Sequence, residues 1–107
     1  PLARVTRRAK RLQTMLRNSC PDGLHVDIRK GSSLAGGGSL PMQEIPTALI
    51  AVKVDHFSSS ALESRLRKQQ VPIIVRIEDD ELLLDLRTIE SSEFSIIRDT
   101  FKSIVSA

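Results

Sequence analysis

The chain has 107 residues, the length of one domain, and 40% of them are hydrophobic, which is enough for a modest core. It contains neither a run of about 18 apolar residues nor a basic-then-apolar leader, so we expect a soluble, cytosolic protein without membrane contacts. Its single cysteine, Cys20, excludes an internal disulfide and fits a reducing compartment. We expect Cys20 to act as a small apolar filler.

Positive charge is concentrated at the beginning of the chain. Six basic residues precede the first acidic one, Asp22, and they are Arg4, Arg7, Arg8, Lys10, Arg11 and Arg17. The other residues hold 10 basic and 13 acidic side chains, so they have a net charge of −3, against +3 for the whole chain. Such asymmetry is found at nucleic-acid or anion contacts, although a charge run on a helix is more often a solvated face.

The first half of the chain is predicted to form a helix and two strands. Residues 4–19 have apolar side chains at helical spacing, and Pro21-Asp22-Gly23 ends the pattern. Apolar and polar residues alternate over 24–28, which predicts a half-exposed strand, and residues 31–41 are expected to be a loop. Residues 47–54 are nearly all apolar, so we place them near the centre of a sheet.

A short helix is predicted next. Ser60 and Glu63 have the Ser-x-x-Glu spacing of a capping box, in which two free amides at a helix start are satisfied reciprocally. We expect a helix of about ten residues to follow, with Leu62 and Leu66 directed inward.

The second half is predicted to be a hairpin and a helix. Alternating aliphatic residues over 71–77 and 82–86 flank an acidic turn with Asp79-Asp80 at its tip. The predicted register gives one aliphatic face, with the pairs Ile77/Leu82, Val75/Leu84 and Ile73/Leu86. Apolar side chains then recur at helical spacing in Phe94, Ile97, Phe101, Ile104 and Val105.

These elements give the order helix, strand, strand, helix, strand, strand, helix, without a repeat or a dividing linker. Helices packed on one face of a small, mainly antiparallel sheet are the simplest arrangement, so the predicted fold class is α+β.

Three stretches resemble one protein family when they are taken together and in order. They are Gly36-Gly37-Gly38-Ser39-Leu40-Pro41, Val71-Pro72-Ile73-Ile74-Val75-Arg76-Ile77 and Leu82-Leu83-Leu84-Asp85-Leu86-Arg87-Thr88. Each motif alone is weak, but their order and spacing over residues 30–90 are similar to the C-terminal end of bacterial selenocysteine synthase, the L-seryl-tRNA(Sec) selenium transferase.

This resemblance implies a fold-type-I pyridoxal-phosphate enzyme, in which residues 1–107 are the C-terminal small domain of a longer chain. The family converts seryl-tRNA(Sec) to selenocysteinyl-tRNA(Sec) with selenium from selenophosphate, and we expect an assembly of identical subunits. The family's cofactor lysine lies in a Ser-Gly-Asp-Lys-like segment that is missing here. We therefore expect the cofactor in the missing large domain and no catalytic or cofactor-binding residue in this chain.

Arg76 and Ser39 are the candidate substrate contacts. Small-domain arginines of such enzymes clamp substrate carboxylates, but Arg76 is also a diagonal neighbour of Asp85 in the predicted hairpin, which favours a structural ion pair. The glycine-rich loop before Ser39 allows close approach to an anion, although a simple connection is the more common role.

The basic helix is the candidate RNA contact. Arg4, Arg7, Arg8 and Arg11 occupy one broad side and are the candidates for contacts with tRNA phosphates, whereas a solvated face or a seam with the large domain is the more common role of such a charged helix. His25 and His56 lack the spacing of metal ligands, so no metal site is predicted. Two other functions remain open: a related pyridoxal-phosphate lyase acting on a small substrate, and a free-standing binding module of ferredoxin-like shape.

Overall fold

The computed structural model describes residues 1–35, 43–71 and 73–106. Its elements in chain order are α1 (Leu2–Ser19), β1 (Leu24–Ala35), β2 (Gln43–Val54), α2 (Ser59–Arg67), β3 (Arg76–Glu78), β4 (Glu81–Asp85), the 3-10 turn η1 (Ser91–Glu93) and α3 (Phe94–Ser106).

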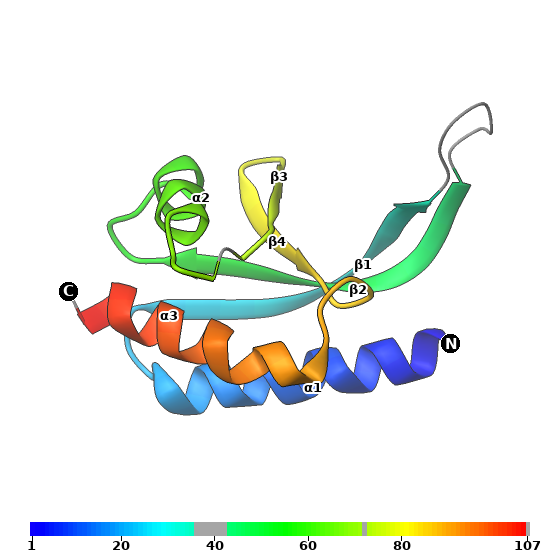
Figure 1. Ribbon diagram of the computed structural model, residues 1–107, viewed down its shortest axis with the longest axis horizontal. Coiled ribbons are helices and arrows are strands. Elements are labelled where there is room, and N and C mark those ends of the chain that lie inside the picture. The colour runs from blue at the N-terminus through cyan, green and yellow to red at the C-terminus, as the bar shows by residue number, and fades with distance from the viewer. Residues whose placement is uncertain (36–42, 72, 107) are drawn as a thin grey trace.

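The strands form one antiparallel sheet in the order β1-β2-β4-β3 (Figure 1). β1 and β2 pair along their full lengths, from Leu24 opposite Val54 to Ala35 opposite Gln43. β4 pairs with β2 only from Leu49 to Val52, so half of the β1–β2 ribbon extends beyond the rest of the sheet. β2 is an inner strand, which confirms the central position predicted for residues 47–54.

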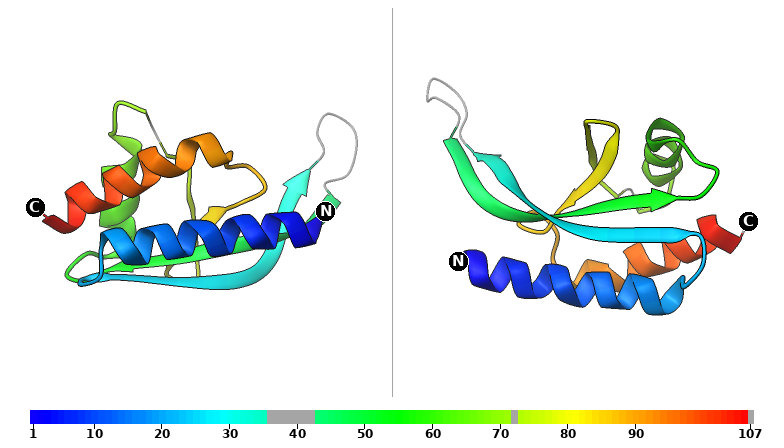
Figure 2. Two further views of the ribbon diagram at one scale, coloured as in Figure 1. Left: turned by 90° about the horizontal axis from the view of Figure 1, so that it is seen from below. Right: turned by 180° about the vertical axis from the view of Figure 1, so that it is seen from behind.

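All three helices contribute to a core on one face of the sheet. α1 and α3 lie side by side beneath the strands, and α2 lies beside β3 and β4 (Figures 1 and 2). The inward Leu62 and Leu66 of α2 belong to the same buried cluster as the apolar residues of α1 and α3. The predicted α+β fold with helices on one sheet face is therefore confirmed. The largest fully buried hydrophobic side chains are Phe94, Phe101, Leu12, Leu16, Ile50, Leu62, Leu66, Leu82, Leu84, Leu86 and Ile97.

The predicted β3–β4 hairpin is present, but its first strand is shorter than expected. Asp79 and Asp80 form the two-residue turn with φ of 51° and 65°, and Ile77 lies opposite Leu82 as predicted. Val71 and residues 73–75 do not join the ladder, so the expected Val75/Leu84 and Ile73/Leu86 pairs are wrong. The amide of Ile73 instead donates to the Leu66 carbonyl of α2 at 3.5 Å. A proline at position 72 also has no N–H group that could donate a hydrogen bond to a neighbouring strand.

Two further boundaries differ from the sequence prediction. β1 continues to Ala35, so residues 31–35 are strand and not loop, because they pair with β2. The cap of α2 is Ser58, whose Oγ accepts from the Ala61 amide at 3.1 Å, so the predicted capping box at Ser60 is wrong. Glu63 instead pairs with Arg67 at 3.0 Å, one helical turn later.

Cys20 is 4% exposed at the C-terminal end of α1, as expected of an apolar filler. Burial raises the pKa of its thiol, and the nearby charge of Lys102 lowers it to a smaller extent. No helix in the described part of the chain is long and apolar enough to cross a bilayer.

Candidate functional site

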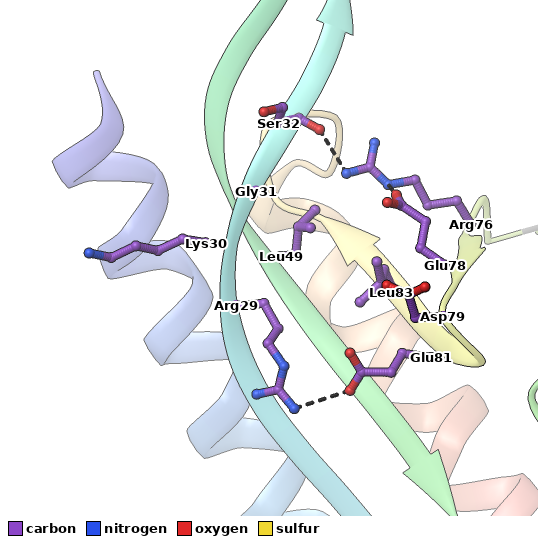
Figure 3. A pocket seen from close by; sticks show the side chains of 10 residues that line it. All are labelled: Arg29, Lys30, Gly31, Ser32, Leu49, Arg76, Glu78, Asp79, Glu81 and Leu83. Carbon is purple, nitrogen blue, oxygen red and sulfur yellow. Dashed lines mark hydrogen bonds and ion pairs between the residues drawn. The ribbon is translucent and has the colours of Figure 1, made fainter.

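The sheet face away from the helices is polar and contains a cavity. Directly opposed residues of antiparallel strands share a face, so alternate residues of all four strands point outward here. A small buried apolar cluster, Leu49, Ala51 and Leu83, lies at its centre. The cavity has a volume of about 430 Å³, and Arg29, Ser32, Arg76, Glu78, Glu81 and Leu83 are among its lining residues (Figure 3).

Arg76 lies at the edge of this cavity and is held by the protein's own groups. One terminal nitrogen, Nη2, donates to the Ser32 carbonyl at 2.7 Å, which joins β3 to β1 across the cavity (Figure 3). Its Nε lies 2.8 Å from Glu78 Oε2, although the contact is not aligned as a hydrogen bond. The ion pair with Asp85 suggested by the hairpin register is present, at 3.8 Å between Nη1 and Oδ2. Arg76 is thus occupied by structural partners.

Asp85 is the centre of a buried polar network that the sequence reasoning missed. Its carboxylate is 11% exposed and accepts hydrogen bonds from Thr47 Oγ1 at 2.7 Å, from the Arg87 amide at 3.0 Å and from Ser33 Oγ. The network connects β1, β2 and β4. A signal was present in the sequence, because the polar Thr47 directly precedes the apolar run 48–52 and lies on the same face as Leu49.

The other arginine at the cavity is also paired. Arg29 lies 3.1 Å from Glu81 (Figure 3). It also lies 3.7 Å from Asp27. A Cβ at Gly31 would lie 2.3 Å from Leu49 Cδ1, so a larger residue there would require the Leu49 side chain to move. Since carboxylates already neutralise both arginines, the cavity is a poor site for an anionic group.

The four arginines predicted on α1 occupy different environments. Arg8 is half-buried and directed at the chain between β4 and α3: it donates to the Leu86 carbonyl at 3.0 Å, to the Ile89 carbonyl and to Ser91 Oγ at 3.3 Å. Arg4, Arg7 and Arg11 are exposed.

Lys10 is exposed on the same side of the helix and was not in the predicted set. We define Arg4, Arg7, Lys10 and Arg11 as the α1 basic face. Among the described residues no carboxylate lies within 4 Å of any of these four cations, whereas Arg29, Arg67, Arg76 and Arg98 all have ion-pair partners. Arg11 has one further contact, 5.8 Å from its guanidinium to the centroid of the Phe94 ring.

The remaining candidates do not form a site. Ser39 lies outside the described residues. His25 lies 3.0 Å from Asp55 at the surface, and His56 has a left-handed φ of 70° in the turn after β2. No group of three or more histidine, cysteine, aspartate or glutamate residues within 1–35, 43–71 and 73–106 is arranged to hold a metal ion.

Comparison with known proteins identifies the family. Residues 1–90 match the family described as L-seryl-tRNA selenium transferase. The chain belongs to this family. The L-seryl-tRNA(Sec) selenium transferase of Aquifex aeolicus is 38% identical over 102 residues, and those of Clostridium botulinum and Alkaliphilus oremlandii are 37% identical over 99 and 101 residues.

These matches cover most of this chain but a small part of each transferase. They include 92 to 95% of the chain and 21 to 22% of the curated relatives, so the chain spans about a fifth of their length. Similarity to the transferases therefore extends into α1 and α3, where the sequence motifs were weakest. The resemblance predicted from the three motifs is confirmed.

Proposed function

We propose that the chain is the C-terminal small domain of a pyridoxal-phosphate enzyme that converts seryl-tRNA(Sec) to selenocysteinyl-tRNA(Sec), with selenophosphate as the selenium donor. The observation that supports it is the match of residues 1–90 to the L-seryl-tRNA selenium transferase family, joined by 38% identity to a transferase of that name over 95% of the chain. The lyase and the free-standing binding module considered from the sequence receive no support from these comparisons.

The residues that the structure describes do not fit the cofactor. All five lysines are exposed, and Lys30, which borders the large cavity, directs its ammonium away from it (Figure 3). Both arginines at that cavity are neutralised by carboxylates, so no cradle for the cofactor's phosphate is formed there. We derive no chemical step through pyridoxal phosphate in this chain and propose that the rest of the enzyme supplies its lysine and phosphate site.

The structure suits a domain that contributes shape instead of reacting groups. Hydrogen bonds of the Asp85 network and from Arg76 to Ser32 connect the strands of its outer sheet face and fix their positions. We propose that this rigid face packs near the catalytic centre of the longer enzyme, which we expect to be an assembly of identical subunits.

The test uses the full-length protein, seryl-tRNA(Sec) and radiolabelled selenophosphate. We expect labelled selenocysteinyl-tRNA(Sec) to form, and light scattering to report a mass of several subunits. Free serine and seryl-tRNA(Ser) serve as controls. Turnover of free serine, or failure to label seryl-tRNA(Sec) with the cofactor bound, would overturn the proposed function.

A further inference from the structure

The α1 basic face has uncompensated charge. Its four cations lie along about 10 Å of helix axis, and the first acidic residue of the chain is Asp22. Elsewhere in the described structure, four arginines have carboxylate partners within 4 Å. A row of cations without intramolecular partners needs counterions, and an anionic partner that displaces those counterions gains free energy.

The helix that presents this row is firmly held. Its apolar side, formed by Val5, Ala9, Leu12 and Leu16, is buried in the core. The same burial argues against a lipid surface as the partner, because an interfacial helix must insert its apolar side into the bilayer. A rigid exposed row of charges is better matched to a polyanion with regularly spaced phosphates.

The α1 basic face can contact the phosphates of such a partner, but it has no aromatic side chain on which bases could stack. It contains no tryptophan or tyrosine, and two of its three phenylalanines, Phe94 and Phe101, are at most 1% exposed. Recognition at α1 would therefore follow the position of the backbone and not the base sequence.

We propose that the α1 basic face, Arg4, Arg7, Lys10 and Arg11, binds the phosphate backbone of the tRNA substrate. This inference rests on the proposed function. It also changes the contact set suggested by helical spacing, because Arg8 is turned toward the Leu86 and Ile89 carbonyls and Lys10 takes its place.

The experiment measures tRNA(Sec) binding by the full-length enzyme as a function of salt. Changing Arg4, Arg7, Lys10 and Arg11 together to Gln should weaken binding at least about tenfold at low salt. It should also reduce the magnitude of the slope of log affinity against log salt by about 3, because the variant makes four fewer phosphate contacts and so releases fewer counterions on binding. A charge-matched control changes four exposed cations elsewhere, Lys53, Arg65, Arg67 and Lys68, to Gln and should keep the parent slope. Replacing Arg4, Arg7 and Arg11 by Lys should restore most of the affinity.

The outcomes separate the two proposals. If the unmodified enzyme neither binds nor converts seryl-tRNA(Sec), the proposed function is wrong. If it does both while the Gln variant retains the parent affinity and slope, the phosphate contact alone is wrong. Loss of subunit assembly in the Gln variant, without rescue of assembly and tRNA affinity by the Lys variant, would identify α1 as a packing seam and also overturn the inference.

Discussion

The neighbouring arginines Arg7 and Arg8 of α1 have different environments, and their hydrogen-bond partners account for the difference. Arg7 is exposed, whereas the next residue, Arg8, is half-buried and bonded to two carbonyls of the chain before α3. Helical spacing places both on the charged side, but Arg8 lies nearest the apolar stripe. The sequence cannot distinguish them, because the partners of Arg8 lie about 80 residues away in the chain.

Arg8→Gln should destabilise the chain by about 1 to 3 kcal/mol, because a shortened side chain leaves the Leu86 and Ile89 carbonyls without their charged donor. Urea unfolding of the isolated chain measures this. The matched control, Arg7→Gln, should stay within about 0.5 kcal/mol of the parent. Equal effects of the two changes would contradict the assigned contacts.

Cys20 should react slowly with a thiol reagent in the folded chain. Burial raises the pKa of this thiol, so less of the reactive thiolate is present at any pH below that pKa, and the side chain is 4% exposed. Reaction with Ellman's reagent at pH 8 should be at least about tenfold slower than in denaturant. Equal rates in the two conditions would mean that Cys20 is accessible in the native state.

At the scale of elements, the alternation of side chains predicted the register of β3 and β4 correctly, whereas capping and strand-end signals did not give the ends of α2 and β3. The register of Ile77 opposite Leu82 follows from alternation around a two-residue turn, because so short a turn allows few other strand pairings. The cap of α2 was missed because Ser58, Ser59 and Ser60 have the same chemistry, and the path of the chain after β2 decides which one caps. Strand β3 was predicted too long because a hydrogen bond from Ile73 to α2 competes with the ladder.

Leu84→Asp should unfold the domain at 25 °C, with a loss above about 4 kcal/mol, because it buries an unpaired charge in the core at a residue with no exposed surface. Ile74→Asp is the control: Ile74 is also an aliphatic residue of this region, but it is 86% exposed. Circular dichroism during thermal unfolding should show a transition for the control and none for Leu84→Asp. A normal transition in both variants would refute the inward direction of Leu84.

At the scale of the molecule, the fold and the family followed from sequence patterns, whereas the arrangement of polar groups did not. The role of Asp85 depends on Ser33 and Thr47, which lie 52 and 38 residues away, and only the sheet order brings the three together. Lys10 likewise joins the proposed α1 basic face only because the structure shows it exposed while Arg8 is bonded to the Leu86 and Ile89 carbonyls.

The isolated chain should not retain pyridoxal phosphate, because its five lysines are all exposed and both arginines at the cavity beside Lys30 are paired with carboxylates. After incubation with the cofactor and dialysis, we expect no absorbance band of a lysine–cofactor Schiff base, and borohydride should not fix the cofactor to one lysine. The full-length enzyme provides the positive control. A stable adduct on a single lysine of the isolated chain would show that a cofactor site lies within it.

The acidic turn between β3 and β4 lies across the sheet from α1 (Figure 1). Glu78, Asp79, Asp80 and Glu81 occupy that turn, while the first 21 residues contain six cations and no acid. Positive charge is therefore gathered at α1 and negative charge at the hairpin turn. In the field of a nucleic acid this separation of charge would favour approach to the α1 side of the domain over approach to the hairpin side.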